Sequence, residues 1–273
     1  TKKHQSVLKS VKGLIKGNKN KVNFFALPGV PKEMKSMFTN YVLPEIEKSL
    51  KNKVVCKSIR TTGVPESILQ EKITDIINAN NGKCDIAFLP HRMLGVDIRL
   101  TSSDNQLVED LIYEIVPRIK KYVYGYDNDK LEQVIADLLI KNNLTVSTAE
   151  SCTSGLLASR LTDVPGSSQY FKGGSVCYSN ELKINDIGID KDLIERYGAV
   201  SEEVAKSLAK NIAQKNNTDL GIGITGIAGP DGGTEKKPVG LVFVGIFYKN
   251  NLYIKKYNFC LLYTSDAADE RLR

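Results

Sequence analysis

Histidine is almost absent from the sequence, and this limits the chemistry that the chain can perform. Only His4 and His91 occur in 273 residues, and neither lies in residues 126–260, which carry the strongest candidate site. Histidine is the usual base that activates a serine nucleophile. A Ser-His-Asp triad contained in that stretch is therefore excluded, and a serine there would need a lysine or a tyrosine as its partner.

Paired cysteines and long apolar runs are also lacking. The five cysteines form no C-x-x-C pair, which argues against a zinc ribbon or a redox dithiol. Their odd number, together with the lack of a signal-peptide pattern, predicts a reducing cytoplasm. No apolar run approaches the roughly 20 residues that a membrane-spanning helix needs, so we expect no membrane span.

What is present is the composition of an ordinary globular chain. Hydrophobic residues make up 41% and charged residues 25%, which excludes wholesale disorder and collagen-like or coiled-coil chains. The net charge of +7 is spread along the sequence, so it favours anionic ligands in general without identifying one. At roughly 150 residues per domain, the length predicts about two domains.

The two ends differ from the rest of the chain. Residues 1–52 hold too little apolar sequence to close a core, and we interpret them as the end of a truncated α/β domain. Residues 24–27 are predicted as a short strand, and a helix is expected to start near Pro31. Residues 261–273 continue no earlier periodicity, so we expect a non-native tail and a fragment at both ends.

Residues 53–124 predict a small split α+β domain. Strands are expected at 54–61, 86–89 and 96–100, the last with alternating apolar residues. One helix should follow Pro65, and its expected apolar face comprises Ile68, Leu69, Ile73, Ile76 and Ile77. A second helix has its apolar face at Leu107, Leu111, Ile112, Ile115 and Ile119. The order β-α-β-β-α predicts a split sandwich, and residues 125–128 are predicted as the hinge that follows it.

Residues 126–260 alternate strand and helix patterns over about 130 residues. The expected strands are 144–149, 173–178, 220–225, 241–247 and an edge strand at 252–259. The expected helices are one from Leu131 capped by Asp127 or Asn128, one at 154–161, one starting at 179–181, and one capped by Ser201. This alternation predicts a three-layer α/β domain with a mainly parallel or mixed sheet.

The sharpest local feature is a run of small polar residues after an apolar strand, at 148–155 (Thr-Ala-Glu-Ser-Cys-Thr-Ser-Gly). Side chains here would lie at a helix N-terminus, where free N–H groups and the helix dipole stabilise an anion. That anion could be a ligand phosphate or the oxyanion of acyl transfer. The alternative is a plain N-cap, since serine and threonine are common caps.

A glycine-rich segment follows the strand predicted at 220–225. Five glycines lie in the sixteen residues 225–240, so the backbone there can approach a ligand closely and form anion-binding nests. The segment matches neither a P-loop nor a G-x-G-x-x-G fingerprint. The alternative is a flexible connection between two strands.

The third feature is Tyr178 at a strand end with Lys183 on the following helix. If burial lowers its pKa from ~10.4, Lys183 could serve as the base for a serine. The alternative for a lone lysine on a helix is a solvated surface charge. Cys152 is a rival nucleophile that also lacks a histidine, and we interpret it as a small buried residue.

Six segments in order resemble the C-terminal domain of the CinA (competence/damage-inducible) family, the nicotinamide-nucleotide amidase. They are 149–153 (AESCT), 164–168 (VPGSS), 178–181 (YSNE), 198–201 (GAVS), 226–233 (GIAGPDGG) and 237–240 (KPVG). Upstream, residues 27–34 (LPGVPKEM) resemble the end of the family's molybdopterin-binding-like domain, and residues 54–122 resemble its KH-like domain. The resemblance covers about residues 20–260.

The resemblance implies hydrolysis of nicotinamide mononucleotide to nicotinic acid mononucleotide and ammonia, a step of pyridine nucleotide salvage. Ser151 matches the family's nucleophile, and Tyr178 and Lys183 match the residues that activate it. The implied substrate-binding residues are Thr153, Ser154 and Gly155 for the oxyanion, and Thr225, Gly226, Gly229 and Gly232 in the glycine-rich loop. Neither a cofactor nor a metal is implied, and a homo-oligomer is compatible with the sequence.

This chain departs from the family pattern in three ways. Ser154 stands where the family usually has glycine, and the arginine-containing segment and last helix that follow the final strand are missing. The catalytic half of the N-terminal domain, a pyrophosphatase acting on ADP-ribose in the family, is missing too.

The alternative is a competence- or DNA-damage-related module that binds nucleic acid or protein without amidase activity. Its support is the KH-like segment and the net charge of +7. Against nucleic acid, residues 54–122 contain no G-x-x-G loop, and their aromatic residues do not interleave with a basic stripe.

Overall fold

The computed structural model describes residues 25–49, 54–91 and 95–259. None of the helices in these ranges has both the length and the apolar character that crossing a bilayer requires. Residues 31–49 are helical and comprise α2 (Pro31–Met37), the π-helical η1 (Phe38–Val42) and α3 (Leu43–Ser49). The helix start expected at Pro31 is therefore confirmed. The strand expected at 24–27 is not formed by residues 25–27, and Phe24 lies outside the described residues.

The first sheet has four strands in the order β2-β3-β1-β4. Its elements are β1 (Val55–Thr61), α4 (Glu66–Asn80), β2 (Asp85–His91), β3 (Gly95–Ser102), α5 (Asn105–Ile119), the 3-10 turn η2 (Lys120–Tyr122) and β4 (Val123–Tyr126). The predicted β-α-β-β-α order is thus confirmed, and β4 adds a fourth strand. Ile68 was expected on the apolar face of α4, but it is 38% exposed, whereas Leu69 and Ile73 are fully buried.

The expected hinge at 125–128 is wrong in its first half. Gly125 and Tyr126 belong to β4, where Tyr126 pairs with Ile59 of β1 in antiparallel register. The turn begins at Asp127, whose φ of 48° is left-handed. Asp127 was also expected to cap the next helix, but its Oδ1 accepts a hydrogen bond from the backbone N–H of Ser58 (2.9 Å).

The second sheet has five strands in the order β6-β5-β7-β8-β9. The strands are β5 (Val146–Glu150), β6 (Phe171–Val176), β7 (Leu220–Gly226), β8 (Leu241–Tyr248) and β9 (Asn251–Asn258). The helices are α6 (Leu131–Lys141), α7 (Leu156–Thr162), α8 (Asn180–Asn185), α9 (Lys191–Tyr197) and α10 (Glu202–Lys215), with a 3-10 turn η3 (Ser167–Gln169). Strand β5 is parallel to β6 and β7, whereas β8 pairs antiparallel with β7, and β9 pairs antiparallel with β8. The expected mixed sheet and the expected edge strand are confirmed.

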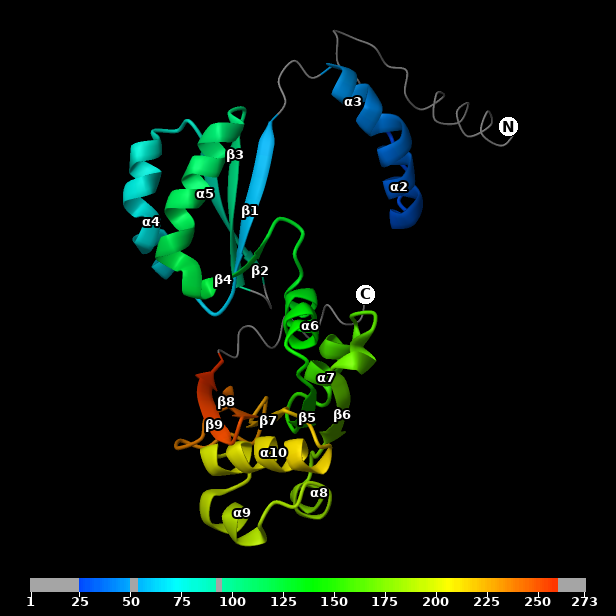
Figure 1. Ribbon diagram of the computed structural model, residues 1–273, viewed down its shortest axis with the longest axis vertical. Coiled ribbons are helices and arrows are strands. Elements are labelled where there is room, and N and C mark those ends of the chain that lie inside the picture. Colours follow the sequence, from blue (N-terminus) through cyan, green and yellow to red (C-terminus); the bar gives the residue numbers. More distant parts are fainter. Residues whose placement is uncertain (1–24, 50–53, 92–94, 260–273) are drawn as a thin grey trace, which may run out of the picture. The chain divides into compact units, whose positions relative to one another are not determined.

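Helices cover both faces of this sheet, as the predicted three-layer fold requires (Figure 1). Ala149 of β5 packs with Leu208 and Ile212 of α10 in one buried cluster. Val146, which points to the other face, packs with Leu139 of α6 and Leu161 of α7 in a second cluster. Because β5 is buried on both faces, its carboxyl end is held rigidly, and Ser151 is the residue that follows it.

Three glycines allow α10 to lie directly on the sheet. A Cβ on Gly223 would lie 2.5 Å from the Ala205 carbonyl oxygen, and a Cβ on Gly245 would lie 2.4 Å from the same atom. A Cβ on Gly221 would lie 1.9 Å from the Ala209 carbonyl oxygen. The sheet backbone and the helix backbone are therefore closer than any side chain would permit.

The helix starts are only partly as expected. Ser179 and Ser201 cap α8 and α10 by accepting hydrogen bonds from backbone N–H groups, which confirms the helix start expected at 179–181 and the cap expected at Ser201. Lys130 occupies the N-cap position of α6 and makes no side-chain capping bond, so the expected Asp127 or Asn128 cap is wrong. Helix α7 begins at Leu156 rather than at 154, because Ser154 (φ 49°) and Gly155 (φ 89°) are both left-handed and cannot continue a helix.

Candidate active site

Ser151 and Lys183 lie in direct hydrogen-bonding contact. Ser151 follows the last residue of β5, and its backbone N–H donates to the Ile224 carbonyl of β7 (3.0 Å). Lys183 lies on α8, and its Nζ is 3.0 Å from the Ser151 Oγ. Two motifs that are 32 residues apart in the chain are thus joined at the carboxyl end of the parallel strands.

The surroundings of Lys183 fit a neutral amine. The residue is 2% exposed, and its Nζ donates to the carbonyl oxygens of Cys177 (2.8 Å) and Tyr178 (3.0 Å). A neutral amine has two N–H donors and one lone pair, so two bonds to carbonyls leave the lone pair free to accept the Ser151 hydroxyl proton. All three partners are uncharged oxygens, and burial lowers the pKa of Lys183 below its ordinary value. The surface-charge interpretation of Lys183 is therefore wrong.

Tyr178 contributes its main chain rather than its hydroxyl to this contact. Its carbonyl accepts from Lys183, whereas the side chain is 70% exposed. Tyr178 lines the same pocket as Ser151. The structure therefore places Tyr178 at the rim, where its side chain can contact a ligand.

Cys152, the alternative nucleophile, is placed less favourably. It is half-buried and borders the pocket, so the expectation of a buried residue is wrong. Burial raises the pKa of its thiol, which keeps the sulfur protonated and a poor nucleophile at neutral pH. Ser151 has a base in contact with its oxygen, so serine is the better candidate.

A pocket of about 270 Å³ opens over this pair. Its floor is formed by the ends of β5 and β7, and the glycine-rich loop and the segment before α10 border it. Of the residues expected in the site, Ser151, Tyr178, Lys183, Thr225, Gly226, Gly229 and Gly232 all line the pocket. The structure also places there residues that the sequence reasoning did not single out, namely Asn180, Ala199, Val200 and Asp231.

Thr153, Ser154 and Gly155 do not line the pocket. They form the turn between Ser151 and α7, and the Ser154 N–H donates to the Ser151 carbonyl (3.1 Å). The Thr153 hydroxyl is buried and has no hydrogen-bond partner among the described residues. The binding of substrate by these three residues stays a prediction.

Glu150, the last residue of β5, is the main feature that the sequence reasoning missed. Its side chain is fully buried, and its carboxylate accepts hydrogen bonds from the N–H groups of Leu157 (3.1 Å) and Ala158 (2.8 Å). These N–H groups belong to the first turn of α7, so the positive end of that helix already faces an anion. The one available signal was an acidic residue at the end of a strand whose other four residues carry no charge.

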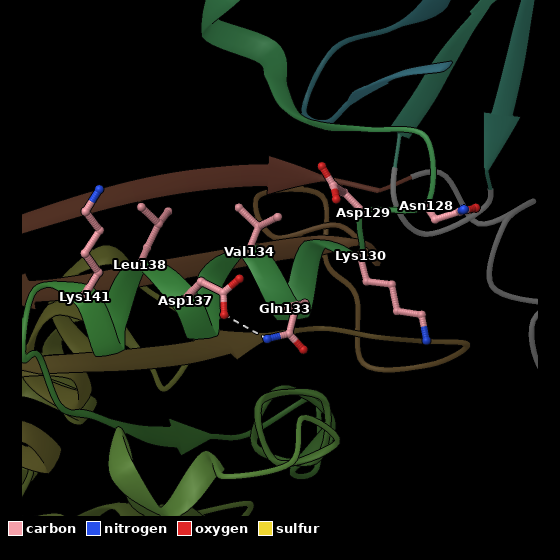
Figure 2. Close-up of a pocket in the computed structure, with 8 residues that line it drawn as sticks. All are labelled: Asn128, Asp129, Lys130, Gln133, Val134, Asp137, Leu138 and Lys141. Carbon is pink, nitrogen blue, oxygen red and sulfur yellow. Dashed lines mark hydrogen bonds between the residues drawn. The ribbon is translucent and has the colours of Figure 1, made fainter. Parts of the chain in front are cut away.

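A separate hollow of about 510 Å³ lies along α6 (Figure 2). The described residues that line it come from α6 and the turn before it, and Gln133 there donates to Asp137 (2.8 Å). None of these lining residues is a serine, cysteine or histidine. The hollow therefore offers no serine or cysteine nucleophile and no histidine base, whereas the pocket over Ser151 pairs a serine with a buried lysine and is the candidate active site.

Comparison with known proteins gives two family matches. The CinA C-terminal domain matches residues 128–261, and the Damage-inducible protein CinA KH domain matches residues 56–125. A CinA-like protein of Dictyoglomus thermophilum is 39% identical over 271 residues, 96% of this chain and 66% of the relative. A CinA-like protein of Dictyoglomus turgidum is 38% identical over 234 residues, 84% of this chain and 57% of the relative. The chain thus spans 57–66% of the length of these two curated relatives.

Two solved structures are similar to about half of this chain. The competence/damage inducible protein CihA from Agrobacterium tumefaciens is 34% identical, with a TM-score of 0.48 over 50% of this chain and 82% of that chain. A competence-damaged protein (CinA) superfamily protein from Enterobacter cloacae is 27% identical, with a TM-score of 0.48 over 53% of this chain and 89% of that chain. With both domain models matched in order and relatives at 38–39% identity, the chain belongs to the CinA family of competence/damage-inducible proteins.

Proposed function

We propose that residues 126–260 form an amidase that hydrolyses the carboxamide of nicotinamide mononucleotide to nicotinic acid mononucleotide and ammonia, in the cytoplasm. The observation that carries the proposal is the 3.0 Å contact between Lys183 Nζ and Ser151 Oγ under a pocket of about 270 Å³. The choice of substrate rests on the resemblance of the six motifs. The choice of reaction rests on the paired nucleophile and base.

The first half of the reaction forms an ester. Ser151 Oγ attacks the carboxamide carbon while its proton passes to Lys183 Nζ, and the carbonyl oxygen becomes an oxyanion. The tetrahedral intermediate collapses, the C–N bond breaks, and the proton on Lys183 goes to the leaving nitrogen to give ammonia. In the second half, water gives a proton to Lys183 and its oxygen attacks the ester carbon. The C–Oγ bond then breaks, Lys183 returns the proton to Ser151 Oγ, and the acid that forms leaves as the carboxylate after losing its own proton to solvent.

The oxyanion needs donors close to Ser151. The N–H of Cys152 follows the nucleophile directly, and it donates to no backbone carbonyl within the described part of the chain. A backbone N–H next to the nucleophile is a common oxyanion donor in hydrolases. We assign Cys152 N–H this role, in place of the N–H groups of α7 that Glu150 already occupies.

Replacement of Ser151 tests the proposal. Ser151→Ala removes the attacking oxygen and should lower ammonia release from nicotinamide mononucleotide by about 10³-fold or more, with an unchanged unfolding temperature. The matched control is Cys152→Ala, which changes the adjacent side chain and should keep most of the activity. If the wild-type chain releases no ammonia, or if Cys152→Ala is inactive while Ser151→Ala is not, the proposal is wrong.

The alternative function, binding of nucleic acid, predicts a complex whose affinity depends on salt. Binding to a phosphate backbone weakens steeply as salt rises, because bound counterions are released. A salt-dependent complex with single- or double-stranded DNA, in the absence of ammonia release, would favour that function over the amidase.

A further inference from the structure

Residues 197–200, which run from the last residue of α9 into the connection to α10, are held through their carbonyl groups, and we call them the carbonyl arch. Gly198 O accepts from Ser201 Oγ (2.9 Å), and Ala199 O accepts from Thr225 Oγ1 (2.8 Å). The two outer carbonyls, those of Tyr197 and Val200, accept from a single group, Lys237 Nζ, at 2.6 and 2.7 Å. All four carbonyls of the arch therefore have side-chain donors.

Lys237 reaches the arch from the far end of the glycine-rich loop. Its own backbone is fixed by a two-way pairing with Thr234, in which Thr234 N–H donates to Lys237 O (2.8 Å) and Lys237 N–H donates to Thr234 O (3.1 Å). Gly198 makes room for the ammonium, since a Cβ there would lie 2.9 Å from Lys237 Nζ. The lysine thus connects the glycine-rich loop to Val200 and Tyr197 of the arch, which are 37 and 40 residues away from it in sequence.

The loop has few other attachments near the pocket. At its base, Ile227 N–H donates to Leu241 O (2.9 Å) and Gly240 N–H donates to Ile227 O (2.7 Å). Between these bonds and the Thr234–Lys237 turn, residues 228–233 make no backbone–backbone hydrogen bond to any described residue. Yet Gly229, Asp231 and Gly232 line the pocket, as do Ala199 and Val200 of the arch.

We propose that Lys237 is a positioning residue that fixes the glycine-rich loop to the carbonyl arch and so sets the affinity of the pocket for its ligand. It does not line the pocket, so it takes no part in bond breaking. Two parts of the pocket lining depend on it, because both the loop and the arch contribute residues to that lining. The expected effect on ligand affinity rests on the proposed amidase function. The attachment of the loop to the arch by Lys237 does not rest on it.

Substitution of Lys237 by methionine tests the inference in two ways. Lys237→Met keeps the length of the side chain and removes both hydrogen bonds to the arch. We expect KM for nicotinamide mononucleotide to rise at least tenfold while kcat stays within about threefold, since Ser151 and Lys183 are untouched. In this variant, hydrogen exchange of the backbone amides at positions 234 and 237 should become about tenfold faster than in the wild type. The backbone amides of α10 should exchange as slowly as in the wild type.

The neighbouring Lys236 supplies the matched control. It is exposed on the same loop, so Lys236→Met removes the same charge without touching the arch. If Lys237→Met matches Lys236→Met in both KM and exchange, or if it lowers kcat with KM unchanged, the inference is overturned. If the wild-type chain releases no ammonia, the proposed function fails, and the exchange measurement alone still decides the role of Lys237.

Discussion

Glu150 and Ala158 are joined across the turn that carries the nucleophile. The buried Glu150 carboxylate accepts from the Ala158 N–H at 2.8 Å and from the Leu157 N–H at 3.1 Å. The N-cap residue of α7 is Gly155, which has no side chain to cap with. Glu150 therefore does the capping from the preceding strand, and it closes residues 151–155 into a fixed turn.

We predict that Glu150→Gln destabilises this turn. The amide keeps the size of the side chain but has one acceptor oxygen in place of two, and it loses the attraction of a carboxylate for the helix N-terminus. The free energy of unfolding should fall by about 1–2 kcal/mol, as for loss of an N-cap, and amidase activity should fall with it. Denaturant unfolding and ammonia release measure the two effects.

Glu181→Gln is the control for that change. Glu181 also lies in the first turn of a helix, α8, but it is exposed. Its substitution should change the free energy of unfolding by no more than about 0.5 kcal/mol. Equal effects of the two substitutions would contradict the role given to Glu150.

We predict that Lys183→Arg is inactive although it keeps the positive charge. A guanidinium stays protonated in proteins, so it cannot accept the Ser151 proton. Lys183→Met should be inactive for the same reason, and both should lose about 10³-fold or more in kcat/KM for ammonia release. Substantial activity in Lys183→Arg would show that the residue acts only through its charge, and the general-base role would fail.

The pH dependence of the reaction follows from the same residue. Burial lowers the pKa of Lys183, and only the neutral amine can take the serine proton. Raising the pH through that pKa converts the ammonium into the base, so log(kcat/KM) should rise with pH and level off below the ordinary lysine value of ~10.4. Rates measured between about pH 6 and pH 10 test this, and activity that falls with pH across that range would contradict it.

The fold was largely predictable because apolar periodicity and capping residues act locally. Strand β8 was expected at 241–247 from its apolar run, and Ser201 was expected as the cap of α10 from its position before two glutamates. The hinge at 125–128 was misplaced because Gly125 suggests a turn. Asp129 instead packs against Gly125, since a Cβ there would lie 2.6 Å from the Asp129 Cβ, and it accepts the Tyr126 N–H (2.8 Å).

The candidate site was predictable in its members but not in its geometry. The motifs containing Ser151 and Lys183 were both singled out, and the structure joins them by one contact of 3.0 Å. The function of Tyr178 as a carbonyl acceptor carries no side-chain signature, so no sequence pattern could indicate it. The capping of α7 by Glu150 depends on the left-handed backbone of Ser154 and Gly155, which lie between Glu150 and the helix. A run of small polar residues does not indicate which of them adopt this conformation.

The close approach of α10 to the sheet gives a prediction about stability alone. Gly245→Ala would place a Cβ 2.4 Å from the Ala205 carbonyl oxygen, a backbone atom that cannot rotate away. Helix α10 must then move off the sheet, which should lower the free energy of unfolding by about 1–3 kcal/mol. Gly29→Ala is the control, since a Cβ there meets no atom within 4 Å, and it should leave denaturant unfolding unchanged. If Gly245→Ala unfolds at the wild-type denaturant concentration, then α10 does not pack against the sheet as closely as these distances require.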